Sequence, residues 1–286
     1  MQIAGFEMLD KLGEGGMASV WKARQISLDR TVAIKILSPR FASDQADVQR
    51  FQTEAQSAAK LKHPGIVQVY DANAEKGVYY FVMEFVAGYT VGDWLHRATV
   101  IPEKDALLVA ESVAEALRYA WEREHIVHCD IKPDNVMVDS DGTVKVADLG
   151  LARTVSLMAR KSVANEILGT PAYMAPEQAR GEQDLDCRTD IYSLGATLYH
   201  MVTGQIPFRG HTEEEMIDMQ IRKTIDDALD VNKKLSKPLC WLIETMLAKK
   251  KENRHKDWAE VLADIKRVKR RIIPARVLAS DGLSTI

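Results

Sequence analysis

Hydrophobic residues follow two different periods along the chain. In the first third, five short runs rich in β-branched and aromatic residues are typical of half-buried strands and predict a five-stranded antiparallel sheet. The runs are 6–12, 20–24, 31–37, 67–71 and 78–84. Between the third and fourth runs, apolar residues from Val48 to Leu61 recur at steps of three and four, which predicts one helix over about 46–62 against the sheet.

After Gly88 the helical period dominates. One apolar stripe extends over 113–121 and another over 191–201. Asp257, followed three residues later by Glu260, predicts a capping box at the start of a last helix. The pattern therefore predicts an α+β chain with a small sheet part followed by a larger helical part.

Composition and charge exclude several classes of protein. With 286 residues, 46% hydrophobic and 28% charged, the chain can bury a full core and has the size at which a domain divides into lobes. A formal net charge of -3 provides no broad basic field for nucleic acids or membranes. The basic cluster at 266–271 fits a solvated helix face, with a phosphate-binding or membrane-adjacent patch as the alternative.

Cysteine usage and the length of the apolar runs indicate in which cellular compartment the chain lies. Cys129, Cys187 and Cys240 are odd in number and far apart, which argues against a disulfide framework or a zinc cluster. The longest apolar runs are shorter than the roughly 18 residues of a membrane helix, and Met1 is not followed by a signal core. We expect a cytoplasmic chain without a membrane span, either alone or as the cytoplasmic domain of a longer membrane-anchored protein.

A glycine-rich turn lies between the first two predicted strands, in the sequence Leu12-Gly-Glu-Gly-Gly-Met-Ala-Ser-Val20. Glycines there would let backbone N–H groups approach phosphate oxygens, although such turns are also common in ordinary hairpins. A later strand carries Lys35 on the same apolar side as Ala33. An ammonium facing a core needs a partner, which Glu54 can supply, either to direct charge at a phosphate or as an ordinary ion pair.

Two oxygen-bearing side chains lie at the ends of a predicted hairpin. The stretches 135–138 and 143–147 flank Asp141-Gly142, a dipeptide that favours a tight turn. Asn135 and Asp148 should therefore lie close together, where they would converge as hard ligands for magnesium.

The sequence His128-Cys-Asp130-Ile-Lys132-Pro-Asp-Asn135 adds an acid and a base directly before this hairpin. Together with the glycine-rich turn, Val32-Ala-Ile-Lys35 and Asp148-Leu-Gly150, it resembles the signatures of the protein kinase family, in the family's order. The resemblance extends from Gly13 to about Arg254, and the strings 12–17 and 176–181 most resemble the bacterial serine/threonine kinases.

This resemblance implies a bilobal kinase fold. It places the kinase domain at 1–272, with an N-lobe at about 1–84, a hinge at 85–88, a helical C-lobe at 89–272 and a tail or linker at 273–286. The implied function is transfer of the γ-phosphate of ATP to serine or threonine hydroxyls of a protein substrate. The implied cofactors are ATP and Mg²⁺, with Mn²⁺ as an alternative metal, and no nucleic-acid partner is expected.

The resemblance also assigns residues to the nucleotide. The glycines would cover the phosphates, Lys35 would contact the α- and β-phosphates, and Glu54 would hold Lys35 in position. Apolar residues would sandwich the adenine behind Met83, and the backbone at 84–86 would hydrogen-bond it. The residues implied at the nucleotide are Leu12, Gly13, Gly15, Gly16, Val20, Ala33, Lys35, Met83, Glu84, Val86 and Met137.

The remaining implied roles concern phosphate transfer. Asp130 resembles the catalytic base, Lys132 the lysine that steadies the γ-phosphate, and Thr170 the threonine that contacts both in serine/threonine kinases. Asn135 and Asp148 resemble the metal ligands. The stretch 169–177 resembles the segment that docks the substrate backbone, with Glu177 expected to pair with Arg254 and Asp190 expected to brace the catalytic loop.

Three positions depart from the family's pattern. Ala18 replaces the third glycine of the phosphate loop, and Leu149 stands where phenylalanine is commoner. Cys129 replaces the arginine that usually grips a phosphorylated residue of the activation loop. We therefore hypothesise that activity does not depend on phosphorylation of the loop, in which Ser162 is the candidate site for a docking mark.

Two other functions compete with a protein kinase. A pseudokinase scaffold or allosteric partner would share the fold, but it would be favoured by loss of Lys35, Asp130 or Asp148, and all three are present. A small-molecule phosphotransferase would share the ATP lobe but lacks the peptide-docking stretch at 169–177 and the bracing Asp190.

Overall fold

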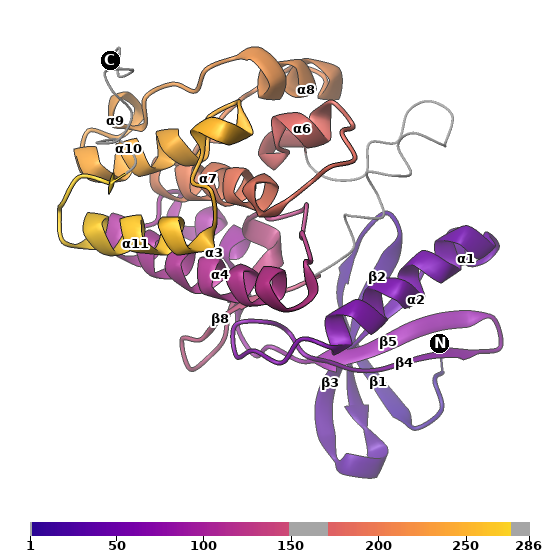
Figure 1. Cartoon of the computed structure of the whole chain (residues 1–286). Helices are drawn as coiled ribbons and strands as arrows, with labels where there is room; N and C mark the ends of the chain where they lie inside the picture. Colours follow the sequence, from indigo (N-terminus) through magenta and orange to yellow (C-terminus); the bar gives the residue numbers. More distant parts are fainter. Residues whose placement is uncertain (1, 149–170, 276–286) are drawn as a thin grey trace.

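The N-terminal part is a five-stranded antiparallel sheet, as predicted (Figure 1). A computed structural model describes residues 2–148 and 171–275, without the side chains of Arg50 and Glu54. The strands are β1 (Phe6–Glu14), β2 (Ala18–Gln25), β3 (Arg30–Leu37), β4 (Val69–Glu75) and β5 (Val78–Glu84). They pair in the order β1-β2-β3-β5-β4, so β3 lies at the centre of the sheet.

The fourth strand begins and ends later than the sequence pattern predicts. The predicted run is 67–71, whereas β4 is Val69–Glu75. The backbone N–H of Val67 donates to the carbonyl oxygen of Val146, in a different sheet, at 3.0 Å. The apolar run is thus shared between two partners, which its hydrophobic pattern could not reveal.

One long helix of this part, α2 (Gln45–Ala59), packs on the sheet after the short α1 (Pro39–Ala42). Asp44 caps α2 by accepting the N–H of Ala46 at 2.7 Å. The stripe from Val48 to Ala58 is buried against Leu37, Val69 and Phe81, as the three- and four-residue spacing predicts. Leu61 lies beyond the helix and is buried in the core of the helical part instead.

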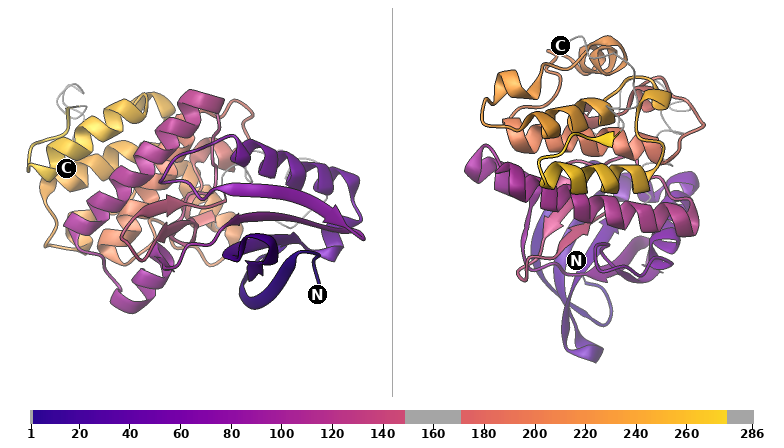
Figure 2. Two further views of the ribbon diagram at one scale, coloured as in Figure 1. Left: turned by 90° about the horizontal axis from the view of Figure 1, so that it is seen from below. Right: turned by 60° about the vertical axis from the view of Figure 1, so that its left-hand side comes forward.

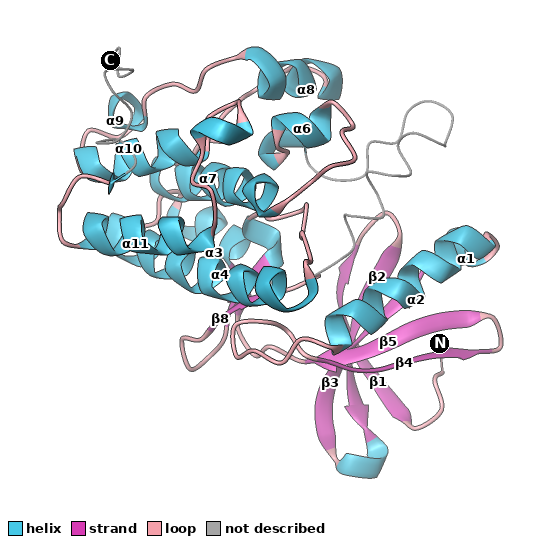
Figure 3. Ribbon diagram, viewed as in Figure 1, coloured by secondary structure: helices cyan, strands magenta, loops and turns pink. Residues whose placement is uncertain are grey.

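The rest of the described chain is mainly helical, with one small sheet (Figure 3). Among the described residues, no helix is both long and apolar enough to cross a membrane. The helices are α3 (Val91–Ala98), α4 (Glu103–Glu124), α6 (Pro176–Ala179), α7 (Cys187–Thr203), α8 (Glu213–Arg222), α9 (Ala228–Val231), α10 (Lys237–Met246) and α11 (Trp258–Lys269). The small sheet joins β6 (Tyr89–Thr90), β7 (Val136–Val138) and β8 (Val144–Val146).

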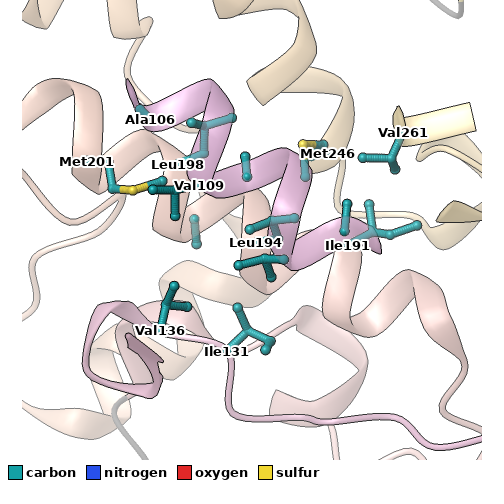
Figure 4. Packing of buried hydrophobic residues seen from close by; sticks show 14 of the residues in the cluster. Ala106, Val109, Ile131, Val136, Ile191, Leu194, Leu198, Met201, Met246 and Val261 are labelled. Atoms are coloured by element: carbon teal, nitrogen blue, oxygen red, sulfur yellow. The ribbon is translucent and has the colours of Figure 1, made fainter. Parts of the chain in front are cut away.

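Helix α7 is the centre of this part. Apart from Arg188 and His200, all of its residues are buried. Its apolar side chains join α4, α10 and α11 in one cluster, part of which, including Leu194 and Leu198, is shown in Figure 4. A helix buried on every side forms a rigid base for the loops that lie on it.

The two parts are joined beside the small sheet (Figure 2). In addition to the bond from Val67, Val146 donates its N–H to the carbonyl oxygen of Gly65 at 2.9 Å. Lys145 of β8 forms an ion pair with Glu84 at 3.0 Å and donates to the carbonyl oxygen of Pro64 at 2.9 Å. These bonds hold together three segments next to Asp148: the loop after α2, the end of β5 and the β7–β8 hairpin.

Candidate active site

The glycine-rich turn forms the tip of the β1–β2 hairpin. The N–H of Gly15 donates to the carbonyl oxygen of Ala18 at 2.8 Å, which closes the turn. A Cβ built on Gly13 or Gly16 would meet no atom within 4 Å, so the space beside both backbones is open. The turn can therefore admit a ligand close to the main chain, the property expected of a phosphate-covering loop.

Lys35 lies at the centre of the sheet, where β3 pairs with both β2 and β5. The residue is 5% exposed, and its Nζ lies 2.9 Å from Oδ1 of Asp148. Lys35 is thus buried and paired with a carboxylate, that of Asp148. The side chain of Glu54 lies outside the described part of the chain, so its contact with Lys35 stays a prediction.

Asp148 follows β8 and has a backbone φ of 58°, in the left-handed region. Burial by itself raises the pKa of this carboxyl, but the adjacent Lys35 ammonium, with help from His128 and Lys132, leaves the pKa below its ordinary value. Asp148 is therefore a carboxylate at neutral pH, which suits a ligand for a cation.

Three polar side chains form a compact cluster in the loop before β7. Lys132 Nζ lies 2.9 Å from Oδ2 of Asp130. Asn135 donates from Nδ2 to Oδ2 and to the main-chain oxygen of Asp130, at 2.9 and 2.8 Å. Because the nitrogen of the Asn135 amide is engaged in this way, its oxygen is the atom turned away from Asp130.

The hairpin brings this cluster to Asp148. The N–H of Ala147 donates to the carbonyl oxygen of Asn135 at 2.9 Å, which fixes the two ends of the hairpin side by side, as predicted. An ammonium, an amide and two carboxylates thus meet at the junction of the sheet and the helical part. The two oxygen donors, Asn135 and Asp148, fit a hard cation such as Mg²⁺ that shares its remaining ligands with phosphate and water.

Asp190 of α7 supports the loop from below, as expected. Its two carboxylate oxygens accept the backbone N–H groups of His128 and Cys129, each at 2.7 Å. Cys129 has a φ of 61°, and Gln178 donates to its carbonyl oxygen at 2.8 Å. The backbone next to Asp130 is therefore held from two sides in a conformation that a side chain other than glycine rarely adopts.

The residues expected around the adenine lie on β2, β3 and β5, in the stretch directly after β5, and on β7. Ala33 on β3 pairs with Met83 on β5, and Met83, Val20 and Met137 are half-buried. Val86 follows β5 and is buried. Their roles at the adenine stay predictions.

Gly88 fixes the course of the chain after this strand. A Cβ there would lie 1.8 Å from the carbonyl oxygen of Val138, so only glycine permits the chain to pass the β7 strand this closely. This position marks the change from strands to helices in the sequence, but its tight contact depends on a segment 50 residues further along.

The substrate-docking stretch is described from Pro171 onward; Gly169 and Thr170 lie outside the described residues. Glu177 and Arg254 form two bonds of 2.7 and 2.8 Å and are fully buried, which confirms the predicted pair. Burial opposes ionisation of Glu177, but the Arg254 guanidinium lowers its pKa below the ordinary value. The stretch is thereby anchored to the base of the helical part.

Two supporting residues were not identified from the sequence. Gln178 carried a usable signal, because it lies at the third position of a helix that starts with Pro176, where its side chain accepts the N–H of Ala175 at 3.1 Å. Lys145 carried none, since its partner Glu84 belongs to another strand and the pairing depends on how the two parts meet.

Comparisons with known proteins agree with this arrangement. The family model of the protein kinase domain matches residues 6–264, and the chain therefore belongs to the protein kinase family. The chain is 38% identical to the serine/threonine-protein kinase PknB of Mycobacterium leprae and 37% identical to PrkC of Bacillus subtilis, over 92% and 91% of its length. It is 36% identical, over 93% of its length, to a probable serine/threonine-protein kinase of Clostridium perfringens.

The similarity covers only part of those relatives. The chain spans 38–43% of their lengths. Among solved structures, the kinase domain of Mycobacterium tuberculosis PknI superimposes with a TM-score of 0.72 at 26% identity, covering 93% of this chain and 97% of the other. The bilobal α+β fold expected from the sequence is thus confirmed.

Proposed function

We propose that this chain is a serine/threonine protein kinase that transfers the γ-phosphate of ATP to hydroxyl groups of a protein. The observation that carries the proposal is the meeting of the Lys35–Asp148 pair with the cluster of Asp130, Lys132 and Asn135. Phosphoryl transfer needs positioned charge and no covalent intermediate with the protein. This site supplies both signs of charge in two hydrogen-bonded groups, which the backbone bond from Ala147 to Asn135 holds side by side.

Each side chain has a definite task in this proposal. Lys35 holds the α- and β-phosphates, while the open glycine turn covers the triphosphate. Asp130 orients the acceptor hydroxyl and receives its proton, and Lys132 neutralises charge on the transferred group. Asn135 and Asp148 would hold a divalent cation. When bound, that cation neutralises charge on the phosphate oxygens.

The acceptor class is inferred from three observations. The relatives PknB and PrkC are named serine/threonine-protein kinases, and Lys132 occupies the position expected in that class. The anchored stretch from Pro171 to Glu177 favours a protein acceptor over a small molecule, because it offers an ordered backbone beside the catalytic loop.

The same proposal includes the limits of the lobes and the location of the chain. We assign the N-lobe to 1–84, the hinge to 85–88 and the C-lobe to 89–272, and we propose a cytoplasmic location.

The test compares the unaltered chain with Asp130→Asn, using labelled ATP, Mg²⁺ and a degenerate library of serine and threonine peptides. We expect peptide phosphorylation by the unaltered chain and a loss of turnover by about 10²- to 10⁴-fold in the variant, because the acceptor proton loses its base. A library free of serine and threonine is the control. Absence of transfer by the unaltered chain, with ATP binding preserved, would instead identify a pseudokinase scaffold.

We further propose that activity does not require phosphorylation of the loop that precedes Pro171. Cys129 is 7% exposed, and its Sγ contacts the carbonyl oxygen of Val127 at 3.7 Å, in a small cluster with Leu185 and Trp121. A buried thiol in this position offers no cation to a phosphate, whereas the usual arginine would.

Replacement of Thr154, Ser156 and Ser162 together with alanine tests this point. We expect peptide turnover to stay within about threefold of the unaltered chain, a change of roughly 0.7 kcal/mol in the barrier. Phosphatase-treated unaltered chain is the matched control, since it removes phosphate without changing side chains. Loss of activity in both samples would show that the loop phosphate is required.

A further inference from the structure

Helix α8 carries a single buried residue among those that form it, and that residue is polar. Gln220 is 0% exposed and lies in the last turn of α8. A buried amide without partners would destabilise the fold, so the hydrogen bonds of Gln220 indicate its structural role. Its Nε2 donates to the carbonyl oxygens of Pro171 and Ala172, at 2.9 and 2.8 Å.

The amide is fixed in one orientation. Its Oε1 accepts the hydroxyl of Tyr192 at 2.7 Å, and that hydroxyl accepts from Nζ of Lys249 at 2.9 Å. Lys249 also donates to the main-chain oxygen of Gln220 at 2.8 Å and lies 4.1 Å above the ring of Phe208. A reversed amide would point its oxygen at two carbonyl oxygens, which can only accept, so the donors must face Pro171 and Ala172.

These two carbonyls belong to the start of the described docking segment, Pro171–Ala175. At the other end of the segment, Gln178 accepts the N–H of Ala175 and donates to the carbonyl oxygen of Cys129, next to the catalytic loop. One buried glutamine thus ties the segment to the catalytic loop, and a second ties it to α8. The position of the segment depends on both.

We propose that Gln220 is a positioning residue for the protein substrate: it holds Pro171–Ala175 at the distance from Asp130 that a bound acceptor requires. The inference rests on the proposed kinase function and adds a path by which α8, a helix whose other residues are exposed or half-buried, acts on substrate use. A ligand or partner that displaces α8 would alter use of the protein substrate and leave use of ATP unchanged.

The test uses Gln220→Met, which keeps the length of the side chain and removes both donors. The peptide is the best one found in the serine/threonine library. We expect the KM for this peptide to rise about 3- to 10-fold, as loss of one or two neutral hydrogen bonds predicts. The KM for ATP and the rate of ATP hydrolysis without peptide should stay unchanged. Asp218→Asn, on the exposed side of the same helix, is the matched control and should leave all three values unchanged.

A second variant distinguishes loss of substrate positioning from misfolding. Tyr192→Phe removes only the hydroxyl that orients the Gln220 amide, so it should raise the peptide KM by a smaller factor with the same ATP values. An equal fall in peptide phosphorylation and ATP hydrolysis in both variants would mean that Gln220 only stabilises the fold, and unchanged peptide KM in both would refute the inference. If the unaltered chain phosphorylates no peptide, it is the proposed function that fails.

Discussion

The backbone of Cys129 turns into the left-handed region directly before Asp130. For a residue with a side chain this conformation costs of the order of 1–3 kcal/mol and persists only where neighbours enforce it. Asp190 supplies that enforcement through two hydrogen bonds of 2.7 Å to consecutive N–H groups. Full ionisation of Asp190 is what makes both oxygens acceptors, so the state of this carboxyl controls the catalytic loop.

Because Asp190 must be ionised to hold this loop, we expect peptide turnover to depend on pH. Burial raises its pKa to about 6 from an ordinary 3.8, against the opposing effects of His128 and of the backbone donors. Below about pH 6 the carboxyl gains a proton that conflicts with one backbone N–H. We expect peptide turnover to fall as the pH decreases through this value, measured with saturating peptide and ATP.

The variant Asp190→Asn is the control for this prediction. Its amide always carries donors, so it should show low turnover without a transition near pH 6. The free energy of unfolding should depend on pH in the opposite direction to turnover. Because the pKa of Asp190 is raised in the folded state, its contribution to the free energy of unfolding is fully present below pH 3.8 and is lost as the pH rises through about 6. Equal pH profiles of peptide turnover for the unaltered chain and for Asp190→Asn would contradict the assignment of this transition to Asp190.

At the scale of elements, α7 shows why packing and sequence pattern can differ. The stripe at 191–201 predicts a helix with one buried face, yet nearly every residue of α7 is buried. Ser193 and Thr197 are tolerated inside because their hydroxyls donate to the carbonyl oxygens of Thr189 and Ser193, one turn earlier. Burial of the polar face follows from the neighbours of α7 and not from its own period.

Close contact between α7 and α10 depends on Gly195. A Cβ at this position would lie 2.7 Å from Cβ of Met246, an atom that cannot move without its helix. Overpacking costs about 1–3 kcal/mol, whereas alanine in place of glycine stabilises a helix by up to about 1 kcal/mol. We expect Gly195→Ala to lower the free energy of unfolding by up to about 2 kcal/mol in urea titrations, the difference between the two effects.

Glu115→Ala, at an exposed position of α4, is the comparison. It changes helix propensity without contact between helices, and its effect should stay within about 0.5 kcal/mol. A stabilised Gly195→Ala variant would mean that α7 and α10 separate easily.

At the scale of the whole molecule, the buried pair of Glu177 and Arg254 joins segments 77 residues apart. Arg254 also donates to the carbonyl oxygens of Ala248 and Arg188, and Thr189 donates to Glu177. Every charge in this group has several partners, so the pair orders the docking stretch, the start of α7 and the loop before α11 together.

Removal of either partner should be costly. We expect Arg254→Met or Glu177→Gln to lower the free energy of unfolding by about 3–5 kcal/mol, because Arg254→Met leaves the Glu177 carboxylate, and Glu177→Gln the Arg254 guanidinium, buried without its counter-charge. The double variant should lose less than the sum of the two, as measured by guanidinium chloride titration. Additive losses would mean that the two side chains do not stabilise each other. Lys233→Met, at an exposed ion pair, should have almost no effect.

Much of the fold and of the site could be predicted because the signals are local. The spacing of Val48 to Ala58 defines one helical face, and the turn at Asp141-Gly142 brings Asn135 beside Ala147, the residue before Asp148. The limits of β4 could not be predicted, because Val67 pairs with Val146, which follows it by 79 residues. Gln220 was also missed, since a polar residue in an exposed-looking helix gives no sign that two distant carbonyl oxygens will face it.

The sequence by itself determined the five strands and the main helices, the family and the chemical groups of the site, because periods of two and 3.6 residues and short motifs are properties of neighbouring residues. Only the tertiary structure decided how these groups are held: which carboxylate supports the strained backbone at Cys129, where Lys145 joins the two parts, and which glutamines fix the docking segment. Those contacts join residues far apart in sequence, and their geometry depends on how the helices and sheets pack.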